Sequence, residues 1–439
     1  MKETSIKIFG GKKLRGEVKP IPNKNSLVAA LPATILTNED VIYEELPNTL
    51  DIIKILQILK LLGATIRQDK NGRTIINCKT MNSHEIDQKL GGQFRASILF
   101  AGPLLARFGK ARIPMPGGCT LGFRSISAHV DIFKQAGVNV ELKGDWVEFT
   151  SSPKQPKSQY TIWPLEISVT ATENLAMYAA GTLSEFIIID AACEPHVTDL
   201  LTMLVDMGAV IDGIGSNKLV VKGAKEIRGV TFKARPDFVD ITGFIVAAAI
   251  TDGEIRIKGA NIPDIMDGLI KWLELFGIEI IREKSDLIAK RKKSDLKIDE
   301  DSGFPLAAPH LPKLAPRPWP GFPVDVIPVI ATLACKMKGR LLLQNWMYED
   351  GFQFVRELNS LGADILILGP QRIEINGPIR FHGGEVTPPR VIQAMKAVFL
   401  AALCDPAETV IHGIDILKRR YPNIIEVYRG LGATIEVLD

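Results

Sequence analysis

A single cysteine in a glycine-rich loop is the residue whose setting most suggests chemistry. Cys119 follows Gly117 and Gly118, and Gly122 comes three residues later. Glycine adopts backbone torsions that other residues avoid, so such a segment can form a lid or a tight turn. Arg124 lies five residues after Cys119. A thiol near a guanidinium group is more acidic and more reactive than a free thiol. We expect a reactive thiol here, with an incidental buried cysteine on a surface turn as the alternative.

The composition excludes several other kinds of protein. The chain has 439 residues, enough for two or three domains, and 46% of them are hydrophobic, as in globular proteins. A formal net charge of +3 provides no basic field for nucleic acid. The five cysteines show no zinc-ligand or disulfide spacing, which fits a reducing cytoplasm. The N-terminus lacks the apolar core of a signal peptide, and no apolar run approaches the roughly 20 residues that span a bilayer. We therefore expect a cytoplasmic protein that binds no metal and does not associate with a membrane.

An internal repeat determines the expected architecture. A hydrophobic-Gly-small-x-hydrophobic pattern recurs at glycines whose intervals, by subtraction of residue numbers, are 74, 71, 69, 85 and 70 residues. The six glycines are Gly63, Gly137, Gly208, Gly277, Gly362 and Gly432. An amphipathic helical pattern precedes each glycine, for example residues 51–60, and an apolar or alternating segment follows it. We interpret each as a helix that ends at a glycine and leads into a strand.

A second kind of helix is also expected six times. These segments are rich in alanine and apolar on all sides, as buried helices are. They cover residues 26–36, 96–106, 171–182, 241–250, 325–336 and 394–403. A short strand pattern follows each of them, at residues 41–43, 111–113, 186–189, 254–257, 340–343 and 409–411. The repeating unit is therefore a buried helix, a strand, an amphipathic helix and paired strands.

Six such units are too many for a single hydrophobic core, so we predict an α/β protein of two domains with three units each. A solenoid is the structural alternative. One long segment, residues 294–321, interrupts the repeats with an acidic run and a cluster of prolines that continues to Pro323. We expect this proline-rich insertion, residues 294–323, to be stiff but irregular, and functional rather than a linker.

These features together resemble one family. The chain is similar to the UDP-N-acetylglucosamine 1-carboxyvinyltransferases, which are enolpyruvyl transferases of peptidoglycan precursor synthesis, and the similarity runs nearly from end to end. The cysteine loop together with the upstream Arg95-Ala96-Ser97 is its most specific part. Further matching segments are Asn23-Lys24-Asn25, residues 102–109, residues 168–174 and Gly321-Phe322-Pro323-Val324-Asp325.

The resemblance implies a fold and a domain organisation. The fold is the two-domain inside-out α/β barrel, built here from six repeats and shared with 3-phosphoshikimate enolpyruvyl transferase. The first domain is residues 22–235, with the cysteine loop and the nucleotide-sugar contacts. The second is residues 1–21 and 236–439, with Asp325 and the proline-rich insertion.

The resemblance also implies a reaction, in which enolpyruvate passes from phosphoenolpyruvate to the sugar 3-hydroxyl and phosphate is released. This needs an acid for the methylene carbon, cations for the anionic groups and a base for the hydroxyl. By resemblance Cys119 is the acid, Lys24 and Arg124 hold phosphoenolpyruvate, and Asp325 faces the acceptor hydroxyl. Asn25, at a helix start, lies where backbone N–H groups are also offered to the anion.

The same resemblance assigns contacts with the nucleotide sugar. These are Arg95, Arg124, Ser125, Ile126, Ser127, Ala128, Glu166, Ile167, Ser168 and Val169, with a smaller one at Met347. Simpler interpretations remain for three residues. One interpretation is that Lys24 is a solvated cation, and another is that Asp325 is only a helix N-cap. His129 is expected to pack or to hydrogen-bond inside its own helix.

Several positions depart from the family pattern. Glu166, Ser127 and Thr170 replace a lysine, an aspartate and a glycine of the family. In the second domain Gly351 and Asn423 stand where arginines are expected, and a third expected arginine is Gln393 unless a short insertion makes it Arg390. Arg390, Arg419 and Arg420 are the candidate compensating cations, and the run of residues 418–422 resembles the shikimate branch.

The expected activity is therefore enolpyruvyl transfer between phosphoenolpyruvate and UDP-N-acetylglucosamine, without metal or organic cofactor, in cell-wall biogenesis and hence in cell shape and division. Two alternatives stay open. One is a paralogue that acts on another nucleotide or phosphorylated alcohol. The other is a non-catalytic regulator that binds a nucleotide sugar.

Overall fold

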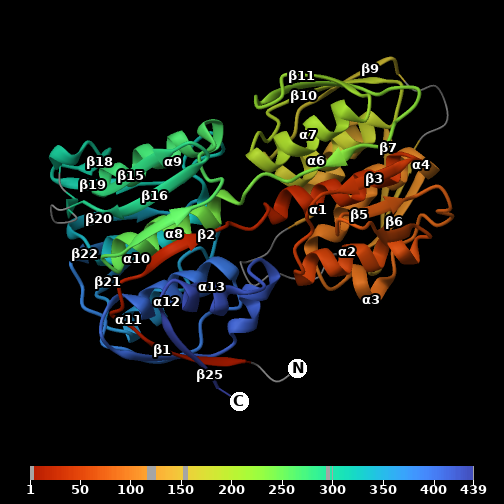
Figure 1. Ribbon diagram of the computed structural model, residues 1–439. Helices are drawn as coiled ribbons and strands as arrows, with labels where there is room; N and C mark the ends of the chain where they lie inside the picture. Colours follow the sequence, from red (N-terminus) through yellow and green to blue (C-terminus); the bar gives the residue numbers. More distant parts are fainter. Residues whose placement is uncertain (1–3, 116–124, 152–156, 293–296, 299, 439) are drawn as a thin grey trace. The chain divides into compact units, whose positions relative to one another are not determined.

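The computed structural model describes residues 4–115, 125–151, 157–292, 297–298 and 300–438, and Figure 1 shows it as a ribbon. These residues form two compact units. The first unit lies within residues 22–235, and the second combines residues 4–21 with residues 236–438. Each unit has its own hydrophobic core, so the described residues do not form the continuous solenoid that was the alternative.

The first unit contains seven α-helices and two 3₁₀ helices among the described residues. They are α1 Lys24–Ala33, η1 Thr34–Leu36, α2 Leu50–Leu61, α3 Gln88–Gly91, η2 Arg95–Phe100, α4 Ala101–Phe108, α5 Ser127–Gln135, α6 Val169–Ala180 and α7 Pro195–Asp206. Its strands are β3 Asp40–Tyr43, β4 Thr65–Gln68, β5 Thr74–Asn77, β6 Lys110–Pro114, β7 Val138–Lys143, β8 Trp146–Ser151, β9 Gln159–Ile162, β10 Glu185–Ile189, β11 Val210–Asp212, β12 Lys218–Lys222 and β13 Thr231–Phe232.

The second unit repeats the same kinds of element. Its helices are α8 Phe238–Ile250, α9 Pro263–Leu275, η3 Glu300–Ser302, η4 Val324–Val326, α10 Ile327–Cys335, α11 Val355–Ser360, α12 Ile392–Cys404, η5 Ile414–Arg419 and α13 Ile424–Gly430. Its strands are β1 Ser5–Phe9, β2 Arg15–Val18, β14 Glu254–Ile257, β15 Ile278–Glu283, β16 Asp286–Arg291, β17 Lys297–Ile298, β18 Leu306–Ala308, β19 Leu311–Leu314, β20 Lys338–Gln344, β21 Ile365–Gly369, β22 Arg372–Gly377, β23 Gly384–Val386, β24 Glu408–Ile411 and β25 Thr434–Leu438.

Both predicted helix types are confirmed. The alanine-rich segments form α1, α4, α6, α8, α10 and α12, and every residue of α8 is buried. In the first unit α4 packs against α6, and in the second unit α10 packs against α8 and α12. A helix surrounded by other core elements has no polar face, which explains why these segments read as apolar on all sides.

The six repeat glycines have the backbone conformation that their position requires. Gly63, Gly137, Gly208, Gly277, Gly362 and Gly432 all have positive φ angles, between 77° and 115°. Each follows one of the amphipathic helices, where a left-handed residue ends the helix and turns the chain into a strand. A Cβ at Gly362 would lie 2.6 Å from the ring of His382, so a side chain there would also clash.

The six sheets share one pairing plan. In each sheet the strand after a buried helix pairs antiparallel with a strand that also pairs with the strand after the repeat glycine. In five sheets the strand after the buried helix also pairs, on its other side, with a parallel strand, as β10 does with β9. One face of each sheet covers the helices, so burial alternates along strands such as β10.

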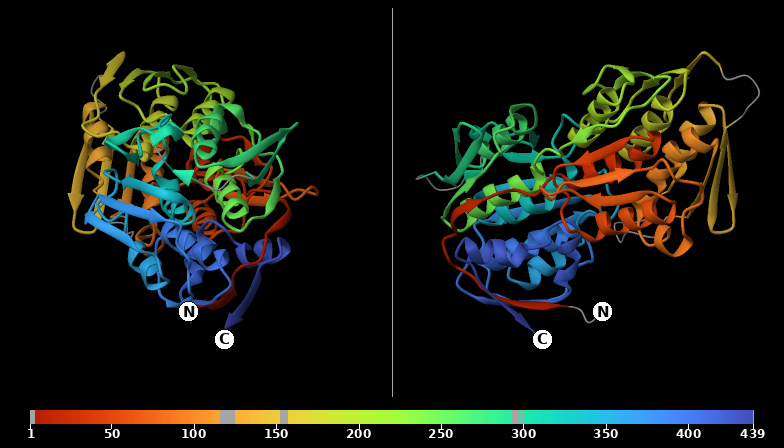
Figure 2. Two further views of the ribbon diagram at one scale, coloured as in Figure 1. Left: turned by 90° about the vertical axis from the view of Figure 1, so that its left-hand side faces the viewer. Right: turned by 45° about the vertical axis from the view of Figure 1, so that its right-hand side comes forward.

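The N-terminal segment completes two sheets of the second unit. β1 lies between β24 and β25, and β2 is the parallel edge strand beside β14. Figures 1 and 2 show the red β1 beside the blue β25, although the two strands are at opposite ends of the sequence. The second unit is therefore built from both ends of the described chain.

The prediction for the proline-rich insertion is wrong in part. The segment contains the short strands β17, β18 and β19, and β19 pairs parallel with β20 while β18 pairs antiparallel with β19. Pro312 does not interrupt this pairing because it stands at the start of the ladder, where the register with β20 begins only at the next residue, Lys313. Proline is tolerated in such places since no ladder donor is lost there.

Candidate functional site

Lys24 is held at the start of the first buried helix. Its Nζ lies 2.9 Å from the Oδ2 of Asp51, and the two side chains are only 12% and 5% exposed. Lys24 is therefore an ordered cation in an ion pair, and the interpretation as a solvated lysine is wrong. Asp51 was not recognised from the sequence; its position in the first turn of α2, after Thr49, was the only local signal.

The backbone donors expected beside Lys24 are already used. The side chain of Asn23 caps α1, and its Oδ1 accepts hydrogen bonds from the N–H groups of Asn25 and Ser26 at 3.0 and 3.4 Å. The expectation that backbone N–H groups at Asn25 are offered to an anion is therefore not met in this structure. The cap instead fixes the first turn that carries Lys24.

Arg95 and the segment that follows the cysteine loop come together in the first unit. An Nη2–H of Arg95, the first residue of η2, donates to the carbonyl oxygen of Ser125 at 3.0 Å. The Oγ of Ser125 in turn accepts from the N–H of Ser127, where α5 begins. Ser125 and Ser127 are exposed, whereas Ile126 and Ala128 are buried in the core.

His129 joins α5 to the second predicted sugar-binding segment. Its Nε2 lies 3.0 Å from the hydroxyl of Thr170, and its Nδ1 accepts from the amide of Asn174 at 3.1 Å. Of the two expectations for His129, packing is confirmed, since the residue is buried, whereas its side-chain hydrogen bonds go to α6 and not to its own helix. Burial and the nearby Arg95 lower the pKa of His129 to about 3. The imidazole stays neutral and links α5 to Thr170 and Asn174 of α6.

The segment before α6 presents its side chains to solvent. Ser168 is the N-cap of α6 and accepts from the N–H of Ala171 at 3.3 Å. Glu166 and Ile167 are exposed, and Val169 is half-buried. Of the predicted contacts in this segment, Ser168 therefore also has a structural role as a helix cap.

The buried histidine has a consequence for acid stability. The unfolded chain takes up a proton at His129 below pH 6.5, whereas the folded protein does so only near pH 3. Since the unfolded state binds the extra proton, stability contributed by His129 is lost as the pH falls through this window. Between pH 6.5 and pH 4, we expect the free energy of unfolding of His129→Gln to fall by a few kcal/mol less than that of the wild type. Urea unfolding at several pH values measures this, and parallel curves for the two proteins would contradict it.

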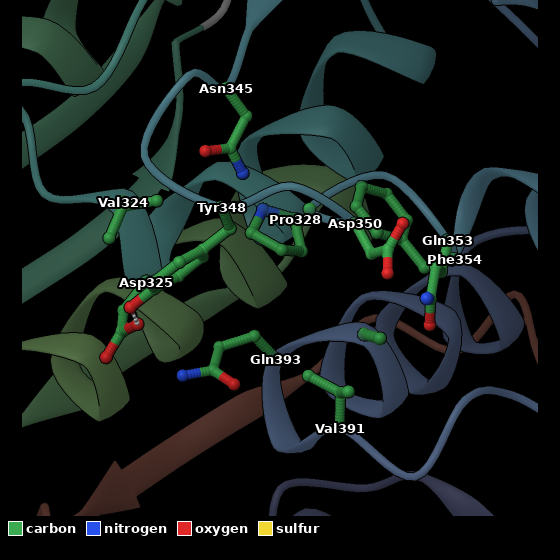
Figure 3. A pocket seen from close by; sticks show the side chains of 12 residues that line it. Val324, Asp325, Pro328, Asn345, Tyr348, Asp350, Gln353, Phe354, Val391 and Gln393 are labelled. Atoms are coloured by element: carbon green, nitrogen blue, oxygen red, sulfur yellow. Dashed lines mark hydrogen bonds between the residues drawn. The ribbon is translucent and has the colours of Figure 1, made fainter. Parts of the chain in front are cut away.

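In the second unit Asp325 lies in a pocket that Figure 3 shows from close by. It stands in the middle of η4, whose N-cap is Pro323, while α10 begins after Val326. The alternative that Asp325 is only an N-cap is therefore wrong. The hydroxyl of Tyr348 donates to Oδ1 of Asp325 at 3.4 Å, a long hydrogen bond. The pocket is lined by Val324, Asp325, Pro328, Asn345, Tyr348, Asp350, Gly351, Gln353, Phe354, Val391, Gln393 and Ala394.

Two positions where the resemblance predicts arginine, the second of them only without an insertion, line this pocket. Gly351 and Gln393 both line it, and neither arginine nor lysine is among its described lining residues. A Cβ at Gly351 would lie 2.1 Å from the side-chain nitrogen of Asn345, which is 2% exposed. Asn345 therefore occupies the space that a side chain at position 351 would need. Met347, the smaller predicted contact, is half-buried next to Tyr348 and does not line the pocket.

The three candidate compensating cations differ in their surroundings. Arg390 is exposed before α12, and Arg419 is half-buried at the end of η5. Arg420 is buried, with Nε and Nη2 each 2.7 Å from an oxygen of Asp237 and Nη1 3.7 Å from Oδ2 of Asp325. Arg420 is thus the cation that lies beside Asp325, but it is already bound to another carboxylate.

Two residues with predicted roles, Cys119 and Arg124, lie outside the described residues. The other four cysteines are all buried. Burial raises the pKa of Cys78 to about 11 and of Cys335 to about 12, and it also raises the pKa values of Cys193 and Cys404. Thiolate chemistry at neutral pH is therefore disfavoured at these four positions, and the role of Cys119 stays a prediction.

Within the described ranges, no group of three or more His, Cys, Asp or Glu side chains is arranged to hold a metal ion. In the same part of the chain, none of the helices combines the length and the apolar character needed to cross a bilayer.

Comparison with known proteins gives a consistent result. A family model described as EPSP synthase (3-phosphoshikimate 1-carboxyvinyltransferase) matches residues 8–428. The chain is 34% identical over 429 residues to UDP-N-acetylglucosamine 1-carboxyvinyltransferase of Bradyrhizobium diazoefficiens, which covers 98% of this chain and 97% of that protein. It is also 34% identical over 432 residues to the protein of the same name from Treponema denticola, covering 98% and 99%.

Solved structures show the same fold at lower identity. The enolpyruvyl transferase NikO from Streptomyces tendae superposes with a TM-score of 0.86 at 22% identity, over 100% of this chain and 99% of that one. EPSP synthase from Acinetobacter baumannii gives a TM-score of 0.75 at 18% identity, over 99% and 100%. The predicted enolpyruvyl transferase fold is thereby confirmed. The chain belongs to the enolpyruvyl transferase family, whose members are enzymes that transfer enolpyruvate from phosphoenolpyruvate to a second substrate.

Proposed function

We propose that this enzyme transfers enolpyruvate to the 3-hydroxyl of UDP-N-acetylglucosamine and so supplies peptidoglycan precursor in the cytoplasm. The observation that carries the proposal is the 34% identity to proteins named for this reaction, which extends over 98% of the chain. Because the matched region covers both units, it includes the elements that carry Lys24, Arg95 and Asp325.

The proposed chemistry proceeds by addition and then elimination. Cys119 protonates the methylene carbon of phosphoenolpyruvate, and the acceptor oxygen attacks the adjacent carbon while its proton passes to Asp325. The resulting ketal then returns a proton from its methyl group to the Cys119 thiolate, phosphate leaves with the electrons of its C–O bond, and the enol ether double bond forms. Acid and base groups are therefore needed at the methylene carbon and at the hydroxyl, and no redox step occurs.

The first unit supports the anion-binding part of the proposal. Lys24 is anchored by Asp51 at the start of α1, so its ammonium group is held in place before a ligand arrives. A preorganised cation stabilises an anion without further ordering cost. In the proposal Lys24, Asn25 and Arg124 contact phosphoenolpyruvate. The contacts with the nucleotide sugar come from Arg95 and from residues 125–128 and 166–169.

The pocket around Asp325 supports a base that faces a hydroxyl-bearing acceptor. Its polar lining residues are carboxylates, carboxamides and one tyrosine, groups that pair with hydroxyl and amide hydrogens. Asp325 is partly exposed there, with 21% of its side chain accessible. A sugar ring presents such hydrogens, whereas a phosphate or carboxylate would require cations.

The lack of cations in that same lining also favours a second candidate. Gly351, and Gln393 if no insertion precedes α12, stand where the resemblance predicts arginine, so the acceptor of this enzyme can differ from that of its relatives. The second candidate is transfer to the hydroxyl of another nucleotide or phosphorylated alcohol. The non-catalytic regulator is disfavoured because Lys24 and Asp325 are both retained.

Phosphate release tests these candidates directly. The purified enzyme is incubated with phosphoenolpyruvate and either UDP-N-acetylglucosamine or a panel of nucleotides and phosphorylated alcohols, and the products are identified by mass spectrometry. We expect phosphate and an enolpyruvyl ether with UDP-N-acetylglucosamine. Turnover only with another acceptor would support the second candidate. Binding of the nucleotide sugar in calorimetry, without phosphate release from any mixture, would support the regulator.

A further inference from the structure

The second unit contains a buried cluster of charged side chains next to the Asp325 pocket. Arg420 lies at its centre, with 3% of its side chain exposed, and Asp237 is fully buried. Asp240 of α8 and Lys396 of α12 complete the cluster. Burying charges requires close pairing, so their arrangement constrains the elements that carry them.

The guanidinium group of Arg420 is fixed by a two-point contact. Nε and Nη2 each lie 2.7 Å from a different oxygen of Asp237. Such a bidentate pair determines both the position and the plane of the guanidinium. Burial alone would lower the pKa of Arg420, but the carboxylate of Asp237 raises it above its usual value. The third nitrogen, Nη1, therefore has a fixed position, 3.7 Å from Oδ2 of Asp325.

Asp237 is itself held in place by the backbone. It is the N-cap of α8, and its Oδ1 accepts from the N–H groups of Val239 and Asp240 at 3.0 and 3.4 Å. Its own N–H donates to the carbonyl oxygen of Ile21 at 2.9 Å. Since α8 is completely buried, Asp237 cannot move without disturbing the core, and Arg420 is anchored to a rigid element.

Asp325 is contacted from two sides. Arg420 faces Oδ2, and the hydroxyl of Tyr348 donates to Oδ1. A carboxylate whose two oxygens have different partners has a preferred orientation.

We propose that Arg420 is a positioning residue that holds the Asp325 carboxylate aimed at the acceptor hydroxyl. The inference rests on the proposed role of Asp325 as the base. It replaces the expectation that Arg420 binds the phosphoenolpyruvate anion, because Nε and Nη2 are already bonded to Asp237. Geometry required in the transition state affects turnover rather than ground-state binding.

Lys396 provides a matched control within the cluster. Its Nζ has no hydrogen-bond partner in the part of the chain that the structure describes, and it lies 4.6 Å from the ring centres of Tyr421 and Tyr428. Burial lowers its pKa to about 8, and Asp240 opposes this shift. Lys396 is thus a buried cation of the same cluster that does not contact Asp325.

The test compares Arg420→Met with Arg420→Lys and Lys396→Met in the phosphate-release assay. For Arg420→Met we expect kcat to fall 10- to 100-fold while both KM values change less than threefold. Arg420→Lys keeps a cation at this position and should restore part of kcat. Lys396→Met should leave kcat and both KM values close to those of the wild type.

A second variant separates positioning from folding. Arg420→Met leaves Asp237 as a buried carboxylate without its guanidinium, which destabilises the unit, so Asp237→Asn/Arg420→Met is made as well. We expect the double variant to fold and to show the same loss of kcat. A wild-type kcat in the folded double variant would overturn the inference, even where Asp325→Asn is inactive.

The crystal structure of the double variant gives a readout that does not depend on the acceptor. We expect the Asp325 carboxylate to rotate away from its orientation beside Tyr348. An unchanged carboxylate would overturn the positioning role. Turnover retained by Asp325→Asn would instead remove the proposed base itself, so the two failures are distinguishable.

Discussion

Asp325→Asn is expected to reduce kcat by about 10²–10⁴-fold and to leave the dissociation constants of both substrates within about threefold. The reason is that a base is needed mainly as the hydroxyl proton leaves. The amide keeps the size and most contacts of the carboxylate, including an oxygen that accepts from Tyr348. Steady-state phosphate release gives kcat, and calorimetry gives the dissociation constants.

The control for Asp325→Asn is Asp364→Asn. Asp364 lies in the same unit, is exposed and does not line the pocket, so the control makes the same change in charge away from Asp325. We expect it to keep both kcat and binding. If Asp325→Asn weakened acceptor binding strongly while turnover at saturation stayed intact, Asp325 would be a binding residue rather than a base.

Lys24→Met should raise the KM for phosphoenolpyruvate by about 10- to 100-fold, because one charge-assisted contact contributes roughly 1.5–3 kcal/mol. Lys24→Arg keeps the charge and should retain part of the affinity. Initial rates at varied phosphoenolpyruvate concentration measure the change.

Two further variants test whether the loss at Lys24 is local. Lys60→Met removes an exposed lysine from the last turn of α2 and should leave the KM unchanged. Asp51→Asn keeps the Lys24 charge but weakens its anchor, so its effect should be smaller than that of Lys24→Met. Equal KM values for Lys24→Met and the wild type would show that Lys24 serves only the ion pair with Asp51.

The sequence by itself determined the repeating plan of this protein. Residue periodicity distinguished the buried helices from the amphipathic ones, and the repeat glycines marked the helix ends with positive φ angles. These signals are readable because helix and strand periodicity and left-handed glycine are local properties. The prediction for the proline-rich insertion was wrong in part because its strands are not a local property. β18 pairs with β19, and β19 in turn pairs with β20, which lies further along the chain.

The tertiary structure alone decided the partners of the candidate site residues. Lys24 and Asp51 are 27 positions apart, His129 and Thr170 are 41 apart, and Arg420 and Asp237 are 183 apart. No local pattern specifies such pairs, because they depend on how the buried helices pack and on which carboxylates become buried beside which cations. The sequence therefore indicated Lys24 and Asp325 as candidate site residues, but packing made Lys24 an anchored cation and placed Arg420, bound to Asp237, beside Asp325.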